Sequence, residues 1–437
     1  MSEKLLEDIE KRLNAKTIHD LRQVARAVGV PRPADGRKER ILEYILQIAE
    51  GKSNPVAPAV RGAHPKSAEY DRQLVADILR CREINLSDKD SAEEKPVELS
   101  VASGAEFSSA GILEKDGDKW FICGSCDIAV NPQFVQRYKL REGDCVSGDC
   151  TRAEGGISVL SSVNSVNGVS PDSIEGRADF ERLTPIYPDV RLKIARGGDD
   201  ITGKLIDLFA PVGKGQRAAV VGKHGTGKTA ILKEIVKGIS FNHPEVKIIF
   251  AAVDTAPEEA AEIRRTFSGC DVFTSPFDAG ADAHIRTARL ALEYAKRQTE
   301  SLKDVLLVLD DLSKLTRAYN STGLVSSELS TSALDSAKRF LAGAKNAAEG
   351  GSLTILTALN PDGVLTDGAA YYGLKDLCNM RVSLSSELAR SRIFPPIDIE
   401  GSYTNGDEKL LSSEEIARAA ALRGKTYAEV VGILKQS

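Results

Sequence analysis

The spacing of apolar residues along the chain changes twice, and each change indicates a different kind of structure. Residues 1–50 have helical spacing in two runs, separated by Gly29, Pro31 and Pro33, which end a helix and hold a turn open. We expect a small N-terminal helical domain over residues 1–50. The apolar positions of the two runs are Leu21, Val24, Ala25 and Val28, then Ile41, Leu42, Ile45 and Ile48.

Residues 51–96 read as a linker followed by a polar helical segment. Pro, Gly and Ala dominate residues 51–65, and the charged stretch that follows is helical around Tyr70–Cys81. Three basic residues open the second N-terminal helix: Arg37, Lys38 and Arg40. They fit either a solvated helix face or a contact with nucleic acid.

Short alternating runs with turn signals fill residues 97–168 and favour a small barrel or OB-fold. One hairpin is expected at Asp116-Gly117, and a second at Glu142-Gly143. Trp120 and Phe121 are adjacent on a strand, so one faces the core and the other faces outward. The outward aromatic is a candidate platform for stacking bases, and packing under a loop is the alternative.

After Pro171, apolar strands alternate with helices through residues 169–437, which predicts a parallel sheet covered on both faces. A helix is expected from Pro257, and a longer one over Ala283–Arg297. The expected strands are RAAVVG, VKIIFAAVD, DVFTSP, DVLLVLDD and GSLTILTAL.

The segment GKHGTGKT fits the phosphate-binding P-loop, because it follows a strand and opens a helix. Glycines let backbone N–H groups turn toward phosphates, and the helix N-terminus adds partial positive charge. Lys228 would reach the terminal phosphates of ATP, and Thr229 would ligate Mg²⁺. The predicted nucleotide-binding residues are Gly222, Gly225, Thr226, Gly227, Lys228 and Thr229.

Asp310 ends an apolar strand, which is the position of the carboxylate that organises Mg²⁺ in P-loop enzymes. Asp311 should point the other way, as a helix cap or surface group. Hydrolysis also needs a carboxylate that orients water and an arginine that neutralises charge. Asp254, Glu258 and Glu259 are the candidate carboxylates. Asp254 also suits the cap of the helix at Pro257, and both glutamates suit its first turn.

Composition adds a few limits. The net charge of −5 gives no global attraction to nucleic acid, so such binding needs local patches. No stretch approaches a membrane span, the N-terminus does not resemble a secretory signal, and seven cysteines favour a reducing cytoplasm. Cys123, Cys126, Cys145 and Cys150 admit a zinc site, but only with a break at Gly148; ordinary thiols are the favoured interpretation.

With these pieces placed, most of the chain resembles the bacterial transcription termination factor Rho. The resemblance implies an α/β protein with a RecA-like P-loop ATPase core, an OB-fold (cold-shock-like) RNA-binding domain and a small N-terminal helical domain. It also implies a homo-hexameric ring that threads single-stranded RNA, hydrolyses ATP between subunits and acts on RNA polymerase. The segments that carry it include PVGKGQRAAVVG, ISFNHPEVKIIF, LLVLDDLSKLTRAYN, KRFLAGAKNAAEGGSLTI, SRIFPPIDIEGS and NPQFVQRYKLREGDCVSG.

The resemblance also assigns roles and reveals departures. The water-activating glutamate of Rho aligns with Thr255, and its arginine finger aligns with Ser386. Arg390 and Arg392 lie one to two helical turns beyond and are candidate substitutes. An aromatic near the adenine is replaced by Leu374. The RNA-binding candidates are Lys119, Trp120, Phe121 and Tyr138, of which Phe121 keeps a stacking aromatic and Lys119 replaces one.

Three functions remain open from the sequence. The chain is an active termination factor, or a degenerate paralogue that binds ATP and RNA as a regulator, or a P-loop module unrelated to RNA. The long matching segments disfavour the third. Because the base and finger positions are both substituted, we expect ATP binding with weak hydrolysis; Lys228 and Asp310 remain the candidate catalytic residues, with Glu258, Arg390 and Arg392 as further candidates.

Overall fold

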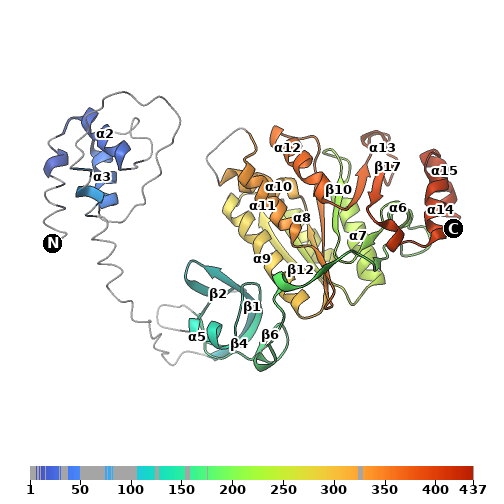
Figure 1. The fold of residues 1–437 in the computed structure, drawn as a ribbon, viewed down its shortest axis with the longest axis horizontal. Coiled ribbons are helices and arrows are strands. Elements are labelled where there is room, and N and C mark those ends of the chain that lie inside the picture. Colours follow the sequence, from blue (N-terminus) through green and yellow to red (C-terminus); the bar gives the residue numbers. More distant parts are fainter. Residues whose placement is uncertain are drawn as a thin grey trace. The chain divides into compact units, whose positions relative to one another are not determined.

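The computed structural model describes residues 6, 9, 11–14, 16–28, 30, 38–49, 74–75, 77–79, 81, 106–123, 127–152, 158–174, 176–322 and 328–436. It divides into two units, 1–100 and 101–437, which are described separately (Figure 1). No helix in these ranges is long and apolar enough to span a membrane.

The first unit contains a small helical core built on α2 (Ile18–Ala27) and α3 (Lys38–Ala49). Thr17 caps α2 by accepting a hydrogen bond from the Asp20 N–H. The apolar positions predicted for the two helices lie in this core, although Leu42 is only partly buried. Leu74, Ile78 and Cys81, from the predicted helix around Tyr70–Cys81, share the core. The predicted linker, residues 51–65, and Arg37 lie outside the described residues, and the Lys38 ammonium donates to the Asn14 carbonyl.

A small closed β-barrel begins the second unit, as the sequence predicted. β1 pairs with both β2 and β4, which closes a six-stranded sheet in the order β1-β2-β3-β5-β4-β6. Its elements are β1 (Glu106–Asp116), β2 (Lys119–Cys123), β3 (Ile128–Val130), α5 (Pro132–Arg137), β4 (Cys145–Arg152), β5 (Ser158–Leu160) and β6 (Ser165–Val166). The core includes Leu113, Ile122, Val146, Cys150 and Leu160.

Two turn predictions for the barrel need correction. The first hairpin forms, but Asp116 pairs with Lys119, so the connecting residues are Gly117 and Asp118. The predicted turn at Glu142-Gly143 forms, with the Asp144 N–H donating to the Arg141 carbonyl, but it makes no hairpin: it connects the helix α5 to 145–152, one continuous strand that pairs with β1. Alternating turn residues therefore signalled a change of direction but not which strands pair.

The continuous course of β4 also bears on the cysteines. Cys150 lies in the barrel core, whereas Cys145 packs on the other face against the core of the sheet domain. The Cys123 thiol donates to Glu114, and Cys126 is outside the described residues. In the described ranges, no group of three or more His, Cys, Asp or Glu side chains is placed to hold a metal ion.

The rest of the second unit is a mixed sheet with helices on both faces (Figure 1). The strands run in the order β12-β11-β13-β15-β10-β16-β17, parallel throughout except for β17 at the edge. All five predicted strands are present, and sequence reasoning missed β16 and β17. The strands are β10 (Arg217–Val221), β11 (Lys247–Thr255), β12 (Asp271–Pro276), β13 (Asp304–Leu309), β15 (Ser352–Leu359), β16 (Met380–Leu384) and β17 (Ile397–Thr404).

Two hydrophobic cores lie on opposite faces of this sheet. One face is covered by α6 (Ile201–Phe209), α7 (Lys228–Asn242), α8 (Pro257–Thr266), α14 (Ser413–Leu422) and α15 (Tyr427–Lys435). The other is covered by α9 (Ala281–Glu300), α10 (Leu312–Ser321), α11 (Thr331–Ala342) and α12 (Leu365–Leu374). Because the long strands are parallel, their carboxyl ends meet at one edge, where ligands bind in such sheets.

Short elements complete the second unit. They are β7 (Pro185–Ile186), β8 (Arg191–Leu192), β9 (Val212–Gly213), β14 (Lys345–Ala347), α13 (Ser386–Arg390) and the 3₁₀ turns Pro171–Ile174, Phe180–Arg182, Lys375–Leu377 and Asp407–Lys409. The segment that joins β16 to β17 contains α13 and passes beside the loop after β10.

The barrel is joined to α9 by a buried carboxylate. Glu114, on β1, accepts hydrogen bonds from Arg286 and Arg289 of α9 and from the Cys123 thiol. Burial acts to raise the pKa of Glu114, but these donors outweigh it and leave the pKa below its usual range. Nearby, Gly143 has a φ of +87°, and a Cβ there would stand 2.4 Å from the Glu293 carbonyl carbon. Only glycine permits this approach of the barrel to α9.

We predict that Arg286→Ala lowers the free energy of unfolding of the second unit by about 1–3 kcal/mol, because the buried carboxylate loses two hydrogen bonds. Urea denaturation at pH 7, followed by the fluorescence of Trp120, measures the loss. Since the pKa of Glu114 is depressed, the contribution is present at neutral pH and disappears as the pH falls through the lowered pKa. The matched control is Arg265→Ala, an exposed arginine on α8; equal stability of the two variants contradicts the prediction.

Candidate functional site

The predicted P-loop connects β10 to α7 at the carboxyl edge of the sheet. The Gly222 N–H donates to the Leu359 carbonyl of β15, which holds the start of the loop against the sheet. Gly225 and Gly227 have φ angles of +79° and +89°, in the left-handed region that favours glycine. Gly227 is also the N-cap of α7, and it leaves the first N–H groups of that helix without a side-chain cap. Unpaired donors at a helix N-terminus suit an anion.

Lys228 and Thr226 close the loop on itself. The Lys228 ammonium donates to the carbonyls of Gly222 at 2.9 Å and Lys223 at 3.4 Å, and the Thr226 hydroxyl donates to the Lys223 carbonyl. Burial lowers the pKa of Lys228, while Asp311 and Asp367 oppose that shift through their charges. The lysine is therefore placed inside the loop, with only neutral carbonyl acceptors.

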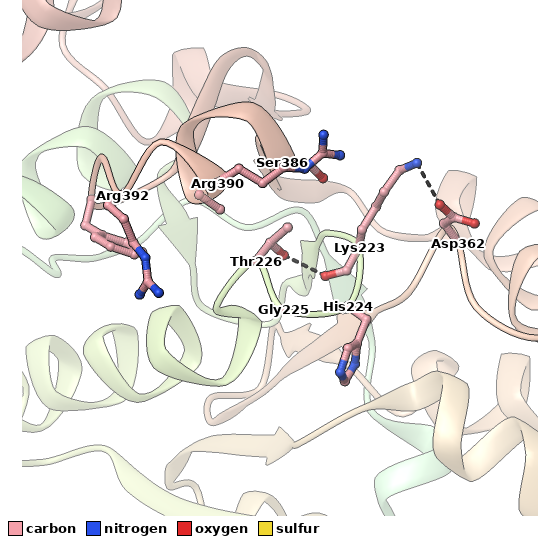
Figure 2. Close-up of a pocket in the computed structure, with 10 residues that line it drawn as sticks. Lys223, His224, Gly225, Thr226, Asp362, Ser386, Arg390 and Arg392 are labelled. Atoms are coloured by element: carbon pink, nitrogen blue, oxygen red, sulfur yellow. Dashed lines mark hydrogen bonds and ion pairs between the residues drawn. The ribbon is translucent and has the colours of Figure 1, made fainter.

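A cavity of about 590 Å³ opens beside the loop (Figure 2). It is lined on one side by P-loop residues and on the other by the segment between β16 and β17. Its charged lining is mostly basic, although Lys223 forms an ion pair with Asp362 at 2.6 Å. The lining residues are Lys223, His224, Gly225, Thr226, Asp362, Ser386, Ala389, Arg390, Arg392 and Phe394. A basic cavity next to a P-loop suits a polyphosphate.

Ser386 and its candidate substitutes all line this cavity, next to the P-loop of their own chain (Figure 2). Ser386 lies in the first turn of α13, Arg390 ends the helix, and Arg392 follows with a φ of +58°. Both arginines are exposed. The structure thus brings Ser386, the predicted arginine-finger position, into one cavity with Arg390 and Arg392, as their spacing in the sequence suggested. Leu374 instead lies fully buried in the hydrophobic core beneath α12.

Asp310 follows β13 and is buried, with three donors on its carboxylate. Oδ1 accepts the Val253 N–H, and Oδ2 accepts the Thr255 hydroxyl and the Lys314 ammonium, each at 3.1 Å. Burial raises the pKa of Asp310 to about 6, although Lys314 and the Val253 N–H act to lower it. The predicted metal-organising carboxylate is therefore already engaged by the protein.

Thr255, which the sequence analysis predicted at the position of a water-activating glutamate, is buried. Its hydroxyl lies 3.1 Å from both Asp310 Oδ2 and the Val253 carbonyl, so it shares one proton between two acceptors. Asp254, predicted as a cap of α8, does not cap it: the cap residue is Ala256, which has no side-chain acceptor. The Asp254 carboxylate lies 3.6 Å from the Arg317 guanidinium instead.

The remaining acidic candidates have distinct positions. Asp311 caps α10 through the Ser313 N–H, as predicted. Burial raises the pKa of Asp311, and the charge of Lys228 opposes the shift, so this carboxylate also acts on the P-loop lysine. Glu258 is exposed in the first turn of α8 and shares a groove of about 570 Å³ with Thr229. Nothing in the sequence indicated that the charges of Asp311 and Lys228 act on each other, because the sequence shows Asp311 only as the residue that follows Asp310.

The predicted RNA-binding residues do not form one surface. Lys119 is exposed and shares a face of β2 with the half-buried Phe121, which pairs with Ala129 and Glu114 across the strands. Trp120 points the other way and packs against the barrel core, where Lys115 lies over its ring. Tyr138 also packs on that core and stacks on Phe134 at 6.3 Å. Only Lys119 and Phe121 are placed together for an outside ligand.

Comparison with known proteins decides the family. Transcription termination factor Rho of Pseudomonas fluorescens biotype C is 36% identical over 381 residues, which cover 81% of this chain and 91% of the relative. The chain belongs to the Rho family. Rho of Pseudomonas aeruginosa is 38% identical and Rho of Escherichia coli K12 is 36% identical, each over 74% of this chain and 81% of the relative.

The chain also resembles a broader protein family and two solved structures. Residues 203–404, which include the P-loop and Asp310, match the nucleotide-binding domain of the ATP synthase alpha/beta family. A solved ATPase of the type III secretion system of pathogenic bacteria covers 57% of this chain and 74% of its own, at 25% identity and a TM-score of 0.48. The assembled ATPase EscN of enteropathogenic E. coli covers 55% and 58%, at 23% identity and a TM-score of 0.48.

We predict that Thr255→Val, which removes the hydroxyl and keeps the shape, lowers the free energy of unfolding by about 1–2 kcal/mol, the usual cost of an unmade buried hydrogen bond. Thr255→Ser keeps the hydroxyl and is the matched control. Urea denaturation of the two variants measures the difference. A Thr255→Val variant as stable as the wild type, with the loss confined to Thr255→Ser, would show that the methyl group, rather than the bond to Asp310, stabilises the site.

Proposed function

We propose that this protein is a Rho-type transcription termination factor that binds ATP and single-stranded RNA and hydrolyses ATP slowly. Family membership supports the termination role, and the P-loop with its basic cavity supports ATP as the ligand. In the same proposal the chain assembles as a homo-hexameric ring in the cytoplasm and acts on RNA polymerase. Its parts are the helical domain 1–50, the connecting segment 51–96, the RNA-binding barrel 97–168 and the ATPase domain 169–437.

The hydrogen bonding of Thr255 is the main observation that supports slow hydrolysis. At the position aligned with the activating glutamate, the chain has a buried hydroxyl whose partners are Asp310 and a main-chain carbonyl. A hydroxyl bonded in this way has no basicity with which to orient a water for attack. The finger position is Ser386, which is neutral. The alternative, a paralogue that regulates termination through bound ATP and RNA without turnover, rests on the same residues.

The residues predicted from sequence to hold Mg²⁺ are Thr229 and Asp310. Thr229 lies in the first turn of α7 and lines the same groove as Glu258, which suits contact with a ligand there. Asp310 has three donors on its carboxylate, one of them a cation. This set does not fit a metal held directly by Asp310. Mg²⁺ that enters with ATP would therefore rely on Thr229 and the phosphates.

ATP turnover in the presence of a cytidine-rich RNA tests the proposal. We expect the wild-type chain to turn over far below the rate of roughly 1 s⁻¹ that marks the low end of ordinary enzymes. The double variant Thr255→Glu, Ser386→Arg should raise turnover by at least about tenfold, since a finger alone contributes on the order of 10³–10⁵ in related reactions.

The matched control for the turnover test is Thr255→Glu, Ser391→Arg, which adds the same two groups but places the arginine at the exposed end of α13. Its turnover should stay well below that of Thr255→Glu, Ser386→Arg, because the two variants differ only in where the arginine stands. Rapid RNA-stimulated turnover by the wild-type chain would overturn slow hydrolysis while leaving the family role intact.

RNA binding is tested at β2. We predict that Phe121→Ala weakens single-stranded RNA binding by about tenfold, because one base–aromatic stack is worth about 1–3 kcal/mol. Fluorescence anisotropy of a labelled oligoribonucleotide measures the affinity. Phe241→Ala, at an exposed aromatic of α7, is the control. If both variants bind as tightly as the wild type, the barrel does not stack bases through Phe121.

A further inference from the structure

The ammonium group of Lys314 sits in a cage made only of oxygen atoms. It donates to the Asp254 carbonyl at 2.8 Å, to Asp310 Oδ2 at 3.1 Å and to the Val253 carbonyl at 3.4 Å. An ammonium has three protons, and each has an acceptor here. Lys314 therefore has no free proton to offer a phosphate, and its charge is fixed beside Asp310.

The backbone of β11 builds this cage. The pairing of β11 with β12 shifts register between Val253 and Thr255, so Asp254 is an extra residue in the strand, and its φ is +51°. A bulge of this kind redirects the chain next to a site. Here it leaves the carbonyls of Val253 and Asp254 within reach of Lys314 and the Thr255 hydroxyl within reach of Asp310.

Helix α10 holds the bulge in place from the other side. Lys314 lies in the first turn of α10 and forms an ion pair with Asp310, which lies just before that helix, at 3.1 Å. Arg317, three residues on, pairs with the Asp254 carboxylate at 3.6 Å and with the buried Asp367 at 2.7 Å. Two cations of one helix thus hold the carbonyl and the carboxylate of the same bulge residue.

Such a cage uses the ligands that a hard metal ion prefers, a carboxylate and main-chain carbonyls. A fixed positive charge within hydrogen-bond distance of Asp310 also repels a divalent cation, most strongly where water is excluded. At the position where related enzymes organise Mg²⁺, this chain therefore already carries a cation of its own.

We propose that Lys314 is a built-in counter-cation at Asp310, so that ATP binds this chain with little contribution from Mg²⁺. The inference rests on the proposed nucleotide binding. It assigns to Lys314 a role in setting the metal requirement, and to Asp310 the role of holding Lys314.

The test is the affinity of the full chain for a fluorescent N-methylanthraniloyl ATP, measured in Mg²⁺ and again in EDTA. We expect the two dissociation constants of the wild type to agree within about threefold, less than the tenfold that corresponds to 1.4 kcal/mol. Lys314→Met removes the charge and keeps the length. In that variant Mg²⁺ should tighten binding by about tenfold or more, because Asp310 becomes free to organise the metal.

Two controls isolate the cation. Lys214→Met breaks a Lys–Asp ion pair of 2.7 Å to Asp304, at the opposite end of the same strand β13, and should behave as the wild type. Lys314→Arg keeps a positive charge and should also remain insensitive to Mg²⁺. Thermal melts show whether each variant is folded; if Lys314→Met is not, the wild type and Lys314→Arg decide the question.

The outcomes distinguish failure of this inference from failure of the proposed function. A wild type that loses tenfold or more in affinity in EDTA overturns the proposal, and so does a folded Lys314→Met that stays insensitive to Mg²⁺. Absence of nucleotide binding in both conditions sinks the proposed function instead, since the further inference concerns only how the metal contributes.

Discussion

Lys314 connects three elements through one ammonium group: the bulge of β11, the carboxylate that follows β13 and the first turns of α10. The parallel sheet makes this contact available, because β11 and β13 are neighbours and end at the same edge. The contact satisfies the buried Asp310, which would otherwise be a costly isolated charge. Thr255 donates to the same carboxylate oxygen. The geometry of the carboxyl edge therefore depends on a charge that the protein supplies itself.

In the proposed function, this arrangement separates nucleotide binding from nucleotide cleavage. The features that suit phosphate, namely the left-handed glycines, the start of α7 and Lys228, lie on the β10 side of the edge. The residues proposed to act on a transition state lie around Asp310 and α13. There the chain has Thr255, whose hydroxyl is hydrogen-bonded to Asp310, and the neutral Ser386. Arg390 and Arg392 line the cavity beside the P-loop of their own chain.

Sequence patterns predicted the parts that depend on local chemistry. The P-loop, the five parallel strands and the cap formed by Asp311 follow from glycine positions, apolar runs and helix spacing, and the structure bears them out. The second barrel hairpin failed because turn residues do not say which strands pair. The bulge at Asp254 was missed because a single inserted residue leaves no periodic trace. The four-residue spacing of Asp310 and Lys314 was visible, but its meaning required the burial of Asp310.

A structure of the full chain with ATP and Mg²⁺ tests the central claim most directly, through the distance from the Lys314 ammonium to the Asp310 carboxylate. The two groups should remain within hydrogen-bond distance, with the phosphates held by the P-loop and any metal bound away from Asp310. Lys314 turned away, with Mg²⁺ seated between Asp310 and Thr229, would contradict the claim that the protein supplies its own cation at this position.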